Sequence, residues 1–202
     1  MTIGAIAFDF GGVLTQPPAR GFEEYARELG IPDPALAQYF LGGEMMARLE
    51  VGALSPRDFF RHVCVDAEEK YGQRIDIRRL AAAATAAETL DPAMIAFVRE
   101  LSTHLPIALL TNNVASASWR ATFPFDLFTT VVDSSEVGVR KPEPEIYQAL
   151  IERLGLAPAE ILFVDDLPAN VTGATAVGID AVLFTGLADL HQTLADRGLP
   201  HP

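Results

Sequence analysis

Four segments of the chain place a carboxylate, a hydroxyl or an ammonium group directly after an apolar run or in a constrained loop. They are Phe8-Asp9-Phe10-Gly11-Gly12-Val13, Leu109-Leu110-Thr111-Asn112-Asn113, Gly138-Val139-Arg140-Lys141-Pro142-Glu143-Pro144 and Phe163-Val164-Asp165-Asp166. Taken singly, each has a structural explanation: Asp9 and Thr111 as turn or helix caps, Lys141 as a solvated loop residue. Together they supply a nucleophile, a hydroxyl, a cation and an acid pair, a combination suited to a phosphate group.

The adjacent carboxylates Asp165 and Asp166 indicate a metal site. Two like charges this close disfavour joint ionisation unless a cation compensates them. Oxygen ligands of this kind suit Mg²⁺, which binds one or two carboxylates together with a substrate phosphate. The formal net charge of −12 repels anions at long range, so a phosphate site needs local positive charge from a metal or from Lys141, which two prolines restrain. The same charge argues against nucleic-acid and anionic-membrane binding.

Short apolar segments bounded by turn residues predict the elements that position these groups. We expect strands at residues 5–9, 106–111, 130–133, 161–165 and 181–184, and helices at 92–102, 144–154, 169–177 and 187–196. A further helix start is expected at Ala115. Alternation of buried strands and helices predicts an α/β fold with a doubly wound, mainly parallel sheet. Ligands of such sheets bind beyond the carboxyl ends of the strands, where Asp9, Thr111 and Asp165 fall.

The interval between Asp9 and Thr111 is too long for one strand–helix–strand unit, which takes about 30 residues. The surplus contains no convincing strand, but it contains helix starts at Pro34, at Ser55-Pro56 and in the alanine-rich segment 77–89. Breakers at Pro17-Pro18 and Leu90-Asp91-Pro92 bracket it. We therefore expect a helical cap at 17–88 and a core formed by 1–16 and 89–202. The alternative is that these helices complete a single core.

In these motifs the chain resembles the haloacid dehalogenase-like (HAD) superfamily. The family's four motifs correspond to Asp9-Phe-Gly-Gly-Val13, Thr111, Lys141 and Asp165-Asp166, and the resemblance extends from Ile6 to Phe184. It is closest to the branch with a helical cap after the first strand, which includes the phosphatase domain of soluble epoxide hydrolases and bacterial sugar-phosphate phosphatases. Response-regulator receiver domains use similar groups, but there the acid pair comes first and the lysine last.

The resemblance implies a Mg²⁺-dependent phosphohydrolase of a small phosphorylated metabolite. Asp9 would be the nucleophile and form an aspartyl-phosphate; Asp9, the Gly11 carbonyl and Asp166 would hold Mg²⁺, with Asp165 acting mainly through a water. Lys141 would neutralise Asp9 and the phosphate. Thr111 and the Asn112 N–H would hold phosphate oxygens, and Phe10 completes the predicted substrate-binding set.

Gly11 departs from the family pattern, in which the residue two after the nucleophile is a second Asp that acts as general acid and base. Either another carboxylate, such as Glu44 or Glu50, replaces it, or the leaving group needs little help, or the activity is weak. A phosphate- or metal-binding protein with weakened catalysis is therefore the main alternative. A haloacid dehalogenase is a lesser one, since dehalogenases of this fold need no metal and this chain retains its acid pair.

The remaining expectations concern the environment of the protein. Cys64 is the only cysteine, so no internal disulfide can form; we expect Cys64 in an apolar core and the protein in a reducing cytoplasm. No apolar run is long enough for a membrane span, and the N-terminus lacks the basic region of a secretory signal. Trp119, Phe123 and Phe125 are expected in a core or interface, and Arg140 on the surface. The oligomeric state is left open.

Overall fold

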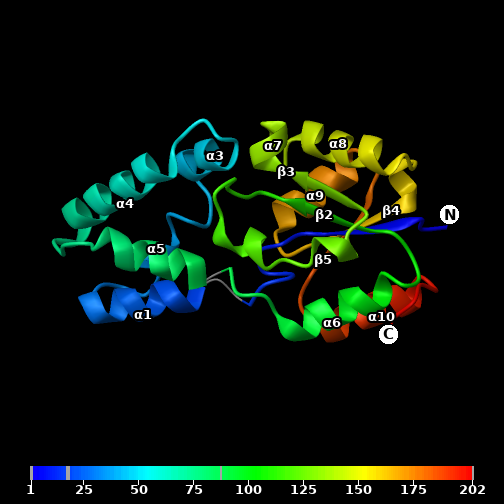
Figure 1. Cartoon of the computed structure of the whole chain (residues 1–202), viewed down its shortest axis with the longest axis horizontal. Helices are drawn as coiled ribbons and strands as arrows, with labels where there is room; N and C mark the ends of the chain where they lie inside the picture. The colour runs from blue at the N-terminus through cyan, green and yellow to red at the C-terminus, as the bar shows by residue number, and fades with distance from the viewer. Residues whose placement is uncertain (1, 17–18, 87, 202) are drawn as a thin grey trace.

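The centre of the structure, a computed structural model that describes residues 2–16, 19–86 and 88–201, is a five-stranded sheet (Figure 1). All neighbouring strands are parallel, in the order β3-β2-β1-β4-β5. The strands are β1 (Ala5–Phe8), β2 (Ile107–Thr111), β3 (Thr130–Asp133), β4 (Ile161–Asp165) and β5 (Asp180–Leu183). The predicted sheet is confirmed, and each strand agrees with its expected range to within one residue.

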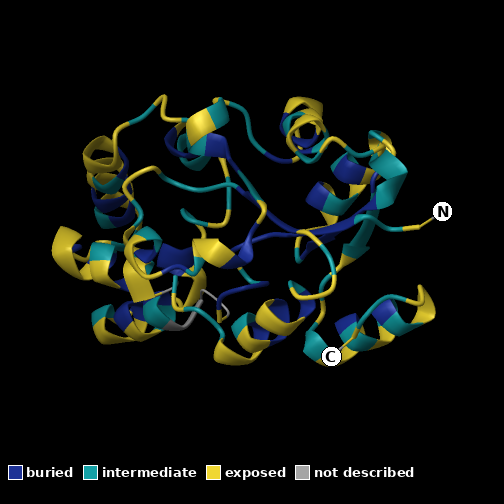
Figure 2. Cartoon of the chain, turned by 45° about the vertical axis from the view of Figure 1, so that its right-hand side comes forward, coloured by how far each residue is buried: buried dark blue, intermediate teal, exposed yellow. Residues whose placement is uncertain are grey.

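Helices cover both faces of the sheet, because successive side chains of each strand point to opposite sides. Ile6 and Phe8 pack with residues of α6 (Pro92–Leu101) and α10 (Leu187–Asp196), whereas Ala7 packs with residues of α8 (Pro144–Leu154) and α9 (Pro168–Ala176). The strands β1, β2 and β4 are buried throughout, which explains their continuous apolar sequences (Figure 2). The doubly wound α/β fold is confirmed.

The helix expected to start at Ala115 is not formed, so that prediction was wrong. After β2 the chain makes a loop in which the Asn113 side-chain oxygen accepts the backbone N–H of Val114 at 2.8 Å. Such local side-chain bonds compete with helix formation. Between this loop and α8 the chain forms only short helices: the 3₁₀ helices η1 (Ser118–Ala121) and η2 (Phe125–Leu127), and the one-turn helix α7 (Ser134–Val137). A third 3₁₀ helix, η3 (Pro158–Glu160), precedes β4.

The described residues between β1 and α6 form five helices around a hydrophobic cluster of their own (Figure 1, left). Ser55 begins the longest of them as expected, since its Oγ accepts the backbone N–H of Asp58 at 3.1 Å. Cys64 is buried in this cluster, as predicted. The helices are α1 (Ala19–Leu29), α2 (Pro34–Ala37), α3 (Glu44–Glu50), α4 (Pro56–Tyr71) and α5 (Ile77–Ala86); no start had been predicted for α1 or α3.

The two chain segments that lead into and out of these helices run side by side. Thr15 and Leu90 form an antiparallel bridge, and the Gln16 N–H donates to the Thr89 carbonyl at 2.9 Å. We propose on this basis that residues 17–88 are a cap on a core made of the rest; the expected breaker Pro17-Pro18 lies outside the described residues. Within the described ranges, no helix combines the length and the apolar character that crossing a bilayer requires.

Candidate active site

Three of the predicted site residues lie at one edge of the sheet because their strands are parallel neighbours. Asp9 follows β1, Thr111 ends β2 and Asp165 ends β4. Strand β1 is hydrogen-bonded to β2 on one side and to β4 on the other. The carboxyl ends of the three strands therefore meet, and their side chains share one site.

Lys141 lies at the centre of this site. Its Nζ is 2.6 Å from Asp9 Oδ1 and 2.7 Å from Asp165 Oδ2, and it donates to the Leu110 carbonyl at 3.0 Å. The side chain is almost fully buried. Lys141 is thus fixed between two carboxylates rather than solvated, and the charge-assisted bonds hold its ammonium group against Asp9.

Asn112 fixes the backbone of Lys141. Its side-chain oxygen accepts the Lys141 N–H at 2.8 Å, and its Nδ2 donates to the Lys141 carbonyl at 3.0 Å. The Asn112 side chain is therefore used within the protein, and only its backbone remains for the phosphate contact expected from the sequence. This positioning role had not been predicted.

Asp165 is held by more partners than the other two acids of the site. It accepts two bonds from Asn170 Nδ2, at 2.9 and 3.0 Å, and one from the Leu167 N–H at 2.9 Å, in addition to the Lys141 contact. Asp166 is only partly buried. These contacts suit an orienting role for Asp165 and leave Asp166 freer to bind a ligand. Asn170 lies five residues after Asp165 in the sequence, and this role at the site had not been predicted for it.

The acids of the site are held in an environment that disfavours their charge. Burial raises the pKa of Asp9 to about 7, with Lys141 opposing this shift and Asp165 adding to it. Burial and the neighbouring Asp165 raise the pKa of Asp166 to about 6. Burial by itself lowers the pKa of Lys141, but the Asp9 and Asp165 carboxylates outweigh it and raise that pKa. A further cation would stabilise the ionised acids.

The residues at this site fit a magnesium ion. Carboxylate oxygens of Asp9, Asp165 and Asp166 lie within 4.8 Å of one another. When all are ionised, three carboxylates and the one lysine leave a net charge of −2, which a divalent cation balances. Gly12 leaves space for the Asp166 side chain, because a Cβ at position 12 would lie 2.1 Å from Asp166 Oδ2. The Gly12 φ of +73° also favours glycine. Oxygen donors are the ligands that Mg²⁺ prefers.

The other predicted residues lie beside this cluster. Thr111 is buried, and its Oγ1 accepts a bond from Asn113 Nδ2 at 3.4 Å. The Phe10 side chain is nearly buried and stacks on Trp119 with ring centroids 4.2 Å apart, and Phe123 contacts both rings. Trp119 and Phe123 belong to the core as predicted. Phe125, which was expected with them, contacts both rings but is 37% exposed. The substrate contacts of Thr111 and Phe10 stay predictions.

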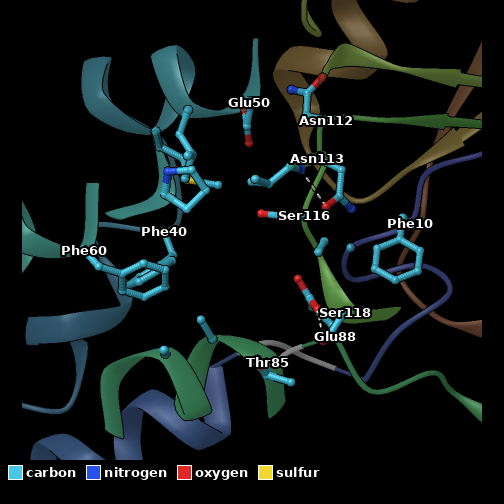
Figure 3. A pocket seen from close by; sticks show the side chains of 18 of the residues that line it. Phe10, Phe40, Glu50, Phe60, Thr85, Glu88, Asn112, Asn113, Ser116 and Ser118 are labelled. Atoms are coloured by element: carbon cyan, nitrogen blue, oxygen red, sulfur yellow. Dashed lines mark hydrogen bonds between the residues drawn. The ribbon is translucent and has the colours of Figure 1, made fainter. Parts of the chain in front are cut away.

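A cavity of about 350 Å³ lies between the cap helices and the core (Figure 3). On the core side its lining includes Phe10, Gly11 and Asn112, which are close in sequence to Asp9 and Thr111. Glu50 projects into it from the end of α3. Arg140 is not on the open surface as predicted: its Nε is 2.7 Å from Glu50 Oε2, because the loop carrying Lys141 passes under the cap. Burial raises the pKa of Glu50, and the nearby charge of Arg140 opposes this increase.

The two cap carboxylates proposed as replacements for the missing acid differ in position. Glu50 is buried, and its backbone carbonyl accepts the Ser134 Oγ at 2.8 Å, which ties α3 to the core. Glu44 is exposed and does not line this cavity. Glu88, which had not been considered, lines the cavity and accepts a bond from Ser118 Oγ at 3.2 Å. The structure thus leaves Glu50 and Glu88, but not Glu44, in the lining of the cavity that Gly11 also lines.

Comparison with known proteins agrees with this geometry. The sequence model of the haloacid dehalogenase-like hydrolases matches residues 3–178. The chain belongs to this family. The HAD-like hydrolase described here is 30% identical to Phosphatase MT3486 of Mycobacterium tuberculosis (strain CDC 1551 / Oshkosh), over 91% of this chain and 88% of that protein. It is 27% identical to Sesquiterpene phosphatase astK of Aspergillus oryzae (strain ATCC 42149 / RIB 40), over 91% of each.

Two further relatives are longer proteins, of which this HAD-like hydrolase matches a part. It covers 17% of Acyl-CoA dehydrogenase family member 10 of Mus musculus at 27% identity, and 40% of Bifunctional epoxide hydrolase 2 of Sus scrofa at 25% identity. These matches extend over 88% and 100% of the present chain. The second confirms the predicted resemblance to epoxide hydrolases.

Solved structures show the same fold. The HAD family enzyme BT-2542 from Bacteroides thetaiotaomicron, crystallised with magnesium and inorganic phosphate, aligns with a TM-score of 0.66 and 24% identity. The alignment covers 90% of this HAD-like hydrolase and 93% of that chain. The predicted HAD-like fold is therefore confirmed.

Proposed function

We propose that this HAD-like hydrolase is a magnesium-dependent phosphohydrolase that releases phosphate from a small phosphorylated organic molecule through an aspartyl-phosphate on Asp9. The observation that carries the proposal is the buried cluster in which Lys141 bridges Asp9 and Asp165, with Asp166 alongside. Phosphatase relatives that match about nine-tenths of the chain support it over a dehalogenase.

The hydrogen bonds of Asp9 distinguish its two oxygens. Oδ1 contacts Lys141 Nζ at 2.6 Å and accepts the Phe10 N–H at 2.6 Å. These contacts restrain the carboxylate, and we assign the attack on phosphorus to Oδ2. A bond forms between Oδ2 and phosphorus while the bond from phosphorus to the substrate's bridging oxygen breaks. The bridging oxygen leaves as an alkoxide, which takes a proton from solvent to become the alcohol. Water then attacks phosphorus and loses a proton to solvent, which frees the Asp9 carboxylate and inorganic phosphate.

The remaining residues serve charge and orientation, which dominate phosphoryl transfer. Lys141 stabilises the charge on Asp9 and on the transferred group, and Thr111 with the Asn112 N–H orients the phosphate oxygens. Asp9, the Gly11 carbonyl and Asp166 would hold Mg²⁺, with Asp165 contributing less directly. When bound, the ion supplies positive charge to the phosphate and to the three acids. A reducing cytoplasm suits the buried, unpaired Cys64.

Phosphate release with Mg²⁺, measured over acyl phosphates, sugar phosphates and alkyl phosphates, tests the proposal. We expect Mg²⁺-dependent turnover that chelation removes and that Asp9→Asn lowers by at least about 10³-fold. The matched control is Asp126→Asn. It makes the same change at an exposed acid that does not belong to the acid cluster, and it should leave turnover unchanged. Turnover that survives Asp9→Asn would refute the assignment.

The second candidate is a metal- and phosphate-binding protein with weakened catalysis, and Gly11 is the observation that favours it. No carboxylate occupies the position from which the family's general acid acts. This candidate predicts Mg²⁺-dependent binding of phosphate with no turnover on any ester of the panel. Halide release in the presence of chelator would instead indicate a dehalogenase.

A further inference from the structure

The lining of the cavity between the cap and the core is mostly apolar. Its cap side is an aromatic and aliphatic wall: Phe22 and Phe40 stack with ring centroids 4.4 Å apart, and Phe60 lies 5.9 Å from Phe40. Figure 3 shows Phe40 and Phe60 facing the open space from the cap. Other apolar side chains that line it are Ala37, Leu41, Met46, Leu49, Pro56, Ala81, Ala84, Val114 and Ala117.

The polar side chains of the cavity are largely bound to protein partners. Glu50 pairs with Arg140, and Glu88 accepts a bond from Ser118. Asn112 is used to hold Lys141, as described above. Asn113 bonds to Thr111 and Val114, so the Thr85 and Ser116 hydroxyls are the ones that the described lining residues leave without a protein partner. Two hydroxyl groups are few for the several hydroxyl groups of a sugar, whose burial without hydrogen bonds is unfavourable.

The described residues that line the cavity carry no positive charge. None of them is a lysine, arginine or histidine, and their two charged side chains, Glu50 and Glu88, are acidic. A second phosphate or a carboxylate on the substrate would meet no counter-charge among these described side chains. The cavity therefore disfavours bisphosphates, nucleotides and acid-bearing substrates.

One edge of the cavity is apolar and open to solvent. Leu41 lines it while 69% of that residue is exposed. A volume of about 350 Å³ is within the range of sites for small organic ligands. An apolar substituent can thus extend from Gly11, two residues after Asp9, along the aromatic wall to the edge at Leu41.

We propose that the substrate is a phosphate monoester of an apolar alcohol, whose hydrocarbon part occupies this cavity while its phosphate lies at Asp9 and Lys141. The proposal rests on the phosphohydrolase function proposed above and specifies the substrate class of that site. A single anionic group and a hydrocarbon body are what the lining can accept. In this cavity the hydroxyl groups of a sugar phosphate would lack hydrogen-bond partners. The additional anionic groups of a nucleotide would lie near acidic side chains.

Two chain-length series test this substrate class. In the first, kcat/KM is measured with Mg²⁺ for n-alkyl phosphates from butyl to decyl, with glucose 6-phosphate and fructose 1,6-bisphosphate for comparison. Burial of each methylene should raise kcat/KM by up to about fourfold until the cavity is filled. In the second, binding of n-alkylphosphonates of the same lengths is measured by calorimetry with Mg²⁺, which requires no turnover.

Two variants on the cap localise the effect. Leu41→Asp should lower the octyl-to-butyl ratio about fivefold or more, because it places a charge beside the hydrocarbon. The control, Val65→Asp, changes a similarly exposed apolar residue of α4 that does not line the cavity, and should leave the ratio unchanged.

The outcomes separate the two proposals. Asp9-dependent turnover that is flat in chain length, or that is higher on sugar phosphates, overturns the substrate class and leaves the phosphohydrolase. If no ester turns over, the phosphonate series decides: affinity that rises with chain length supports an apolar ligand, whereas equal affinity for all lengths overturns it.

Discussion

Restoring a carboxyl at position 11 should increase the turnover of esters with poor leaving groups. An added Cβ at Gly11 would meet no heavy atom within 4 Å, and Gly11 is not among the glycines with positive φ. Because the residue lines the cavity beside Asp9, an aspartate there fits without strain and faces the substrate. The neighbouring carboxylates would raise the pKa of the introduced group, which favours the protonated form that a general acid needs.

The expected gain follows from what a general acid contributes. Protonation of an alkoxide leaving group accounts for about 10²–10⁴-fold in rate. The introduced group also adds negative charge to a site whose ionised residues already sum to −2, as counted above from the three acids and Lys141, which weakens phosphate binding. We therefore expect the lower end, about 100-fold in kcat for octyl phosphate, and little change for p-nitrophenyl phosphate, whose leaving group needs no proton.

Steady-state kinetics of Gly11→Asp on these two substrates, with Gly11→Asn as the control of equal shape, measure the gain. The reasoning is refuted if a folded Gly11→Asp shows no selective gain on octyl phosphate, or if Gly11→Asn matches it. Glu50→Gln and Glu88→Gln in the otherwise unchanged protein identify a substitute acid. If one of these two glutamates donates the proton, its replacement by Gln should lower the turnover of octyl phosphate but not that of p-nitrophenyl phosphate.

Three further predictions concern the metal, the lysine and the packing beneath it. Burial raises the pKa of Asp9 to about 7 and that of Asp166 to about 6, so protons compete with Mg²⁺; the increase in Tm on adding Mg²⁺ should shrink from about pH 8 to about pH 5.5. These raised pKa values stabilise the metal-free fold at low pH, and thermal melts should show that contribution lost as the pH rises through about 6 to 7. Lys141→Met leaves buried carboxylates unpaired, so it should lower the free energy of unfolding, measured with denaturant, by about 3–5 kcal/mol at pH 8. The loss should be smaller at pH 5, where Asp9 is protonated, and an equal loss at both pH values would contradict this. Gly173→Ala places a Cβ 2.8 Å from the Pro142 carbonyl oxygen, so it should destabilise the protein by about 1–3 kcal/mol. It should also lower kcat, because Pro142 belongs to the loop that carries Lys141. An unchanged kcat would show that the position of this loop does not depend on the contact.

The sheet was predictable because its signal is local. Strands β1, β2 and β4 are buried on both faces, so their sequences are continuously apolar. Each ends in a polar residue or is followed by one, and the parallel order brings these residues to one edge. The acid pair and Asp9 could be assigned to one site for this reason, whereas Lys141 lies in a loop and was assigned to the site through the family's motifs. The loop after β2 could not be predicted, because the Asn113 side chain replaces a helical hydrogen bond with a local one.

By itself, the sequence determined the α/β class, the presence of an insert after the first strand and the identity of the groups that meet at the strand ends, since these depend on composition and spacing along the chain. Only the tertiary structure decided how those groups are used. It shows Asn112 holding Lys141, Asn170 holding Asp165 and Arg140 paired with Glu50. These pairs join residues from different elements, most of them far apart in sequence, and no local pattern specifies them. The apolar cavity beside Gly11 has the same origin, because its two walls come from the cap and the core and exist only when these pack together.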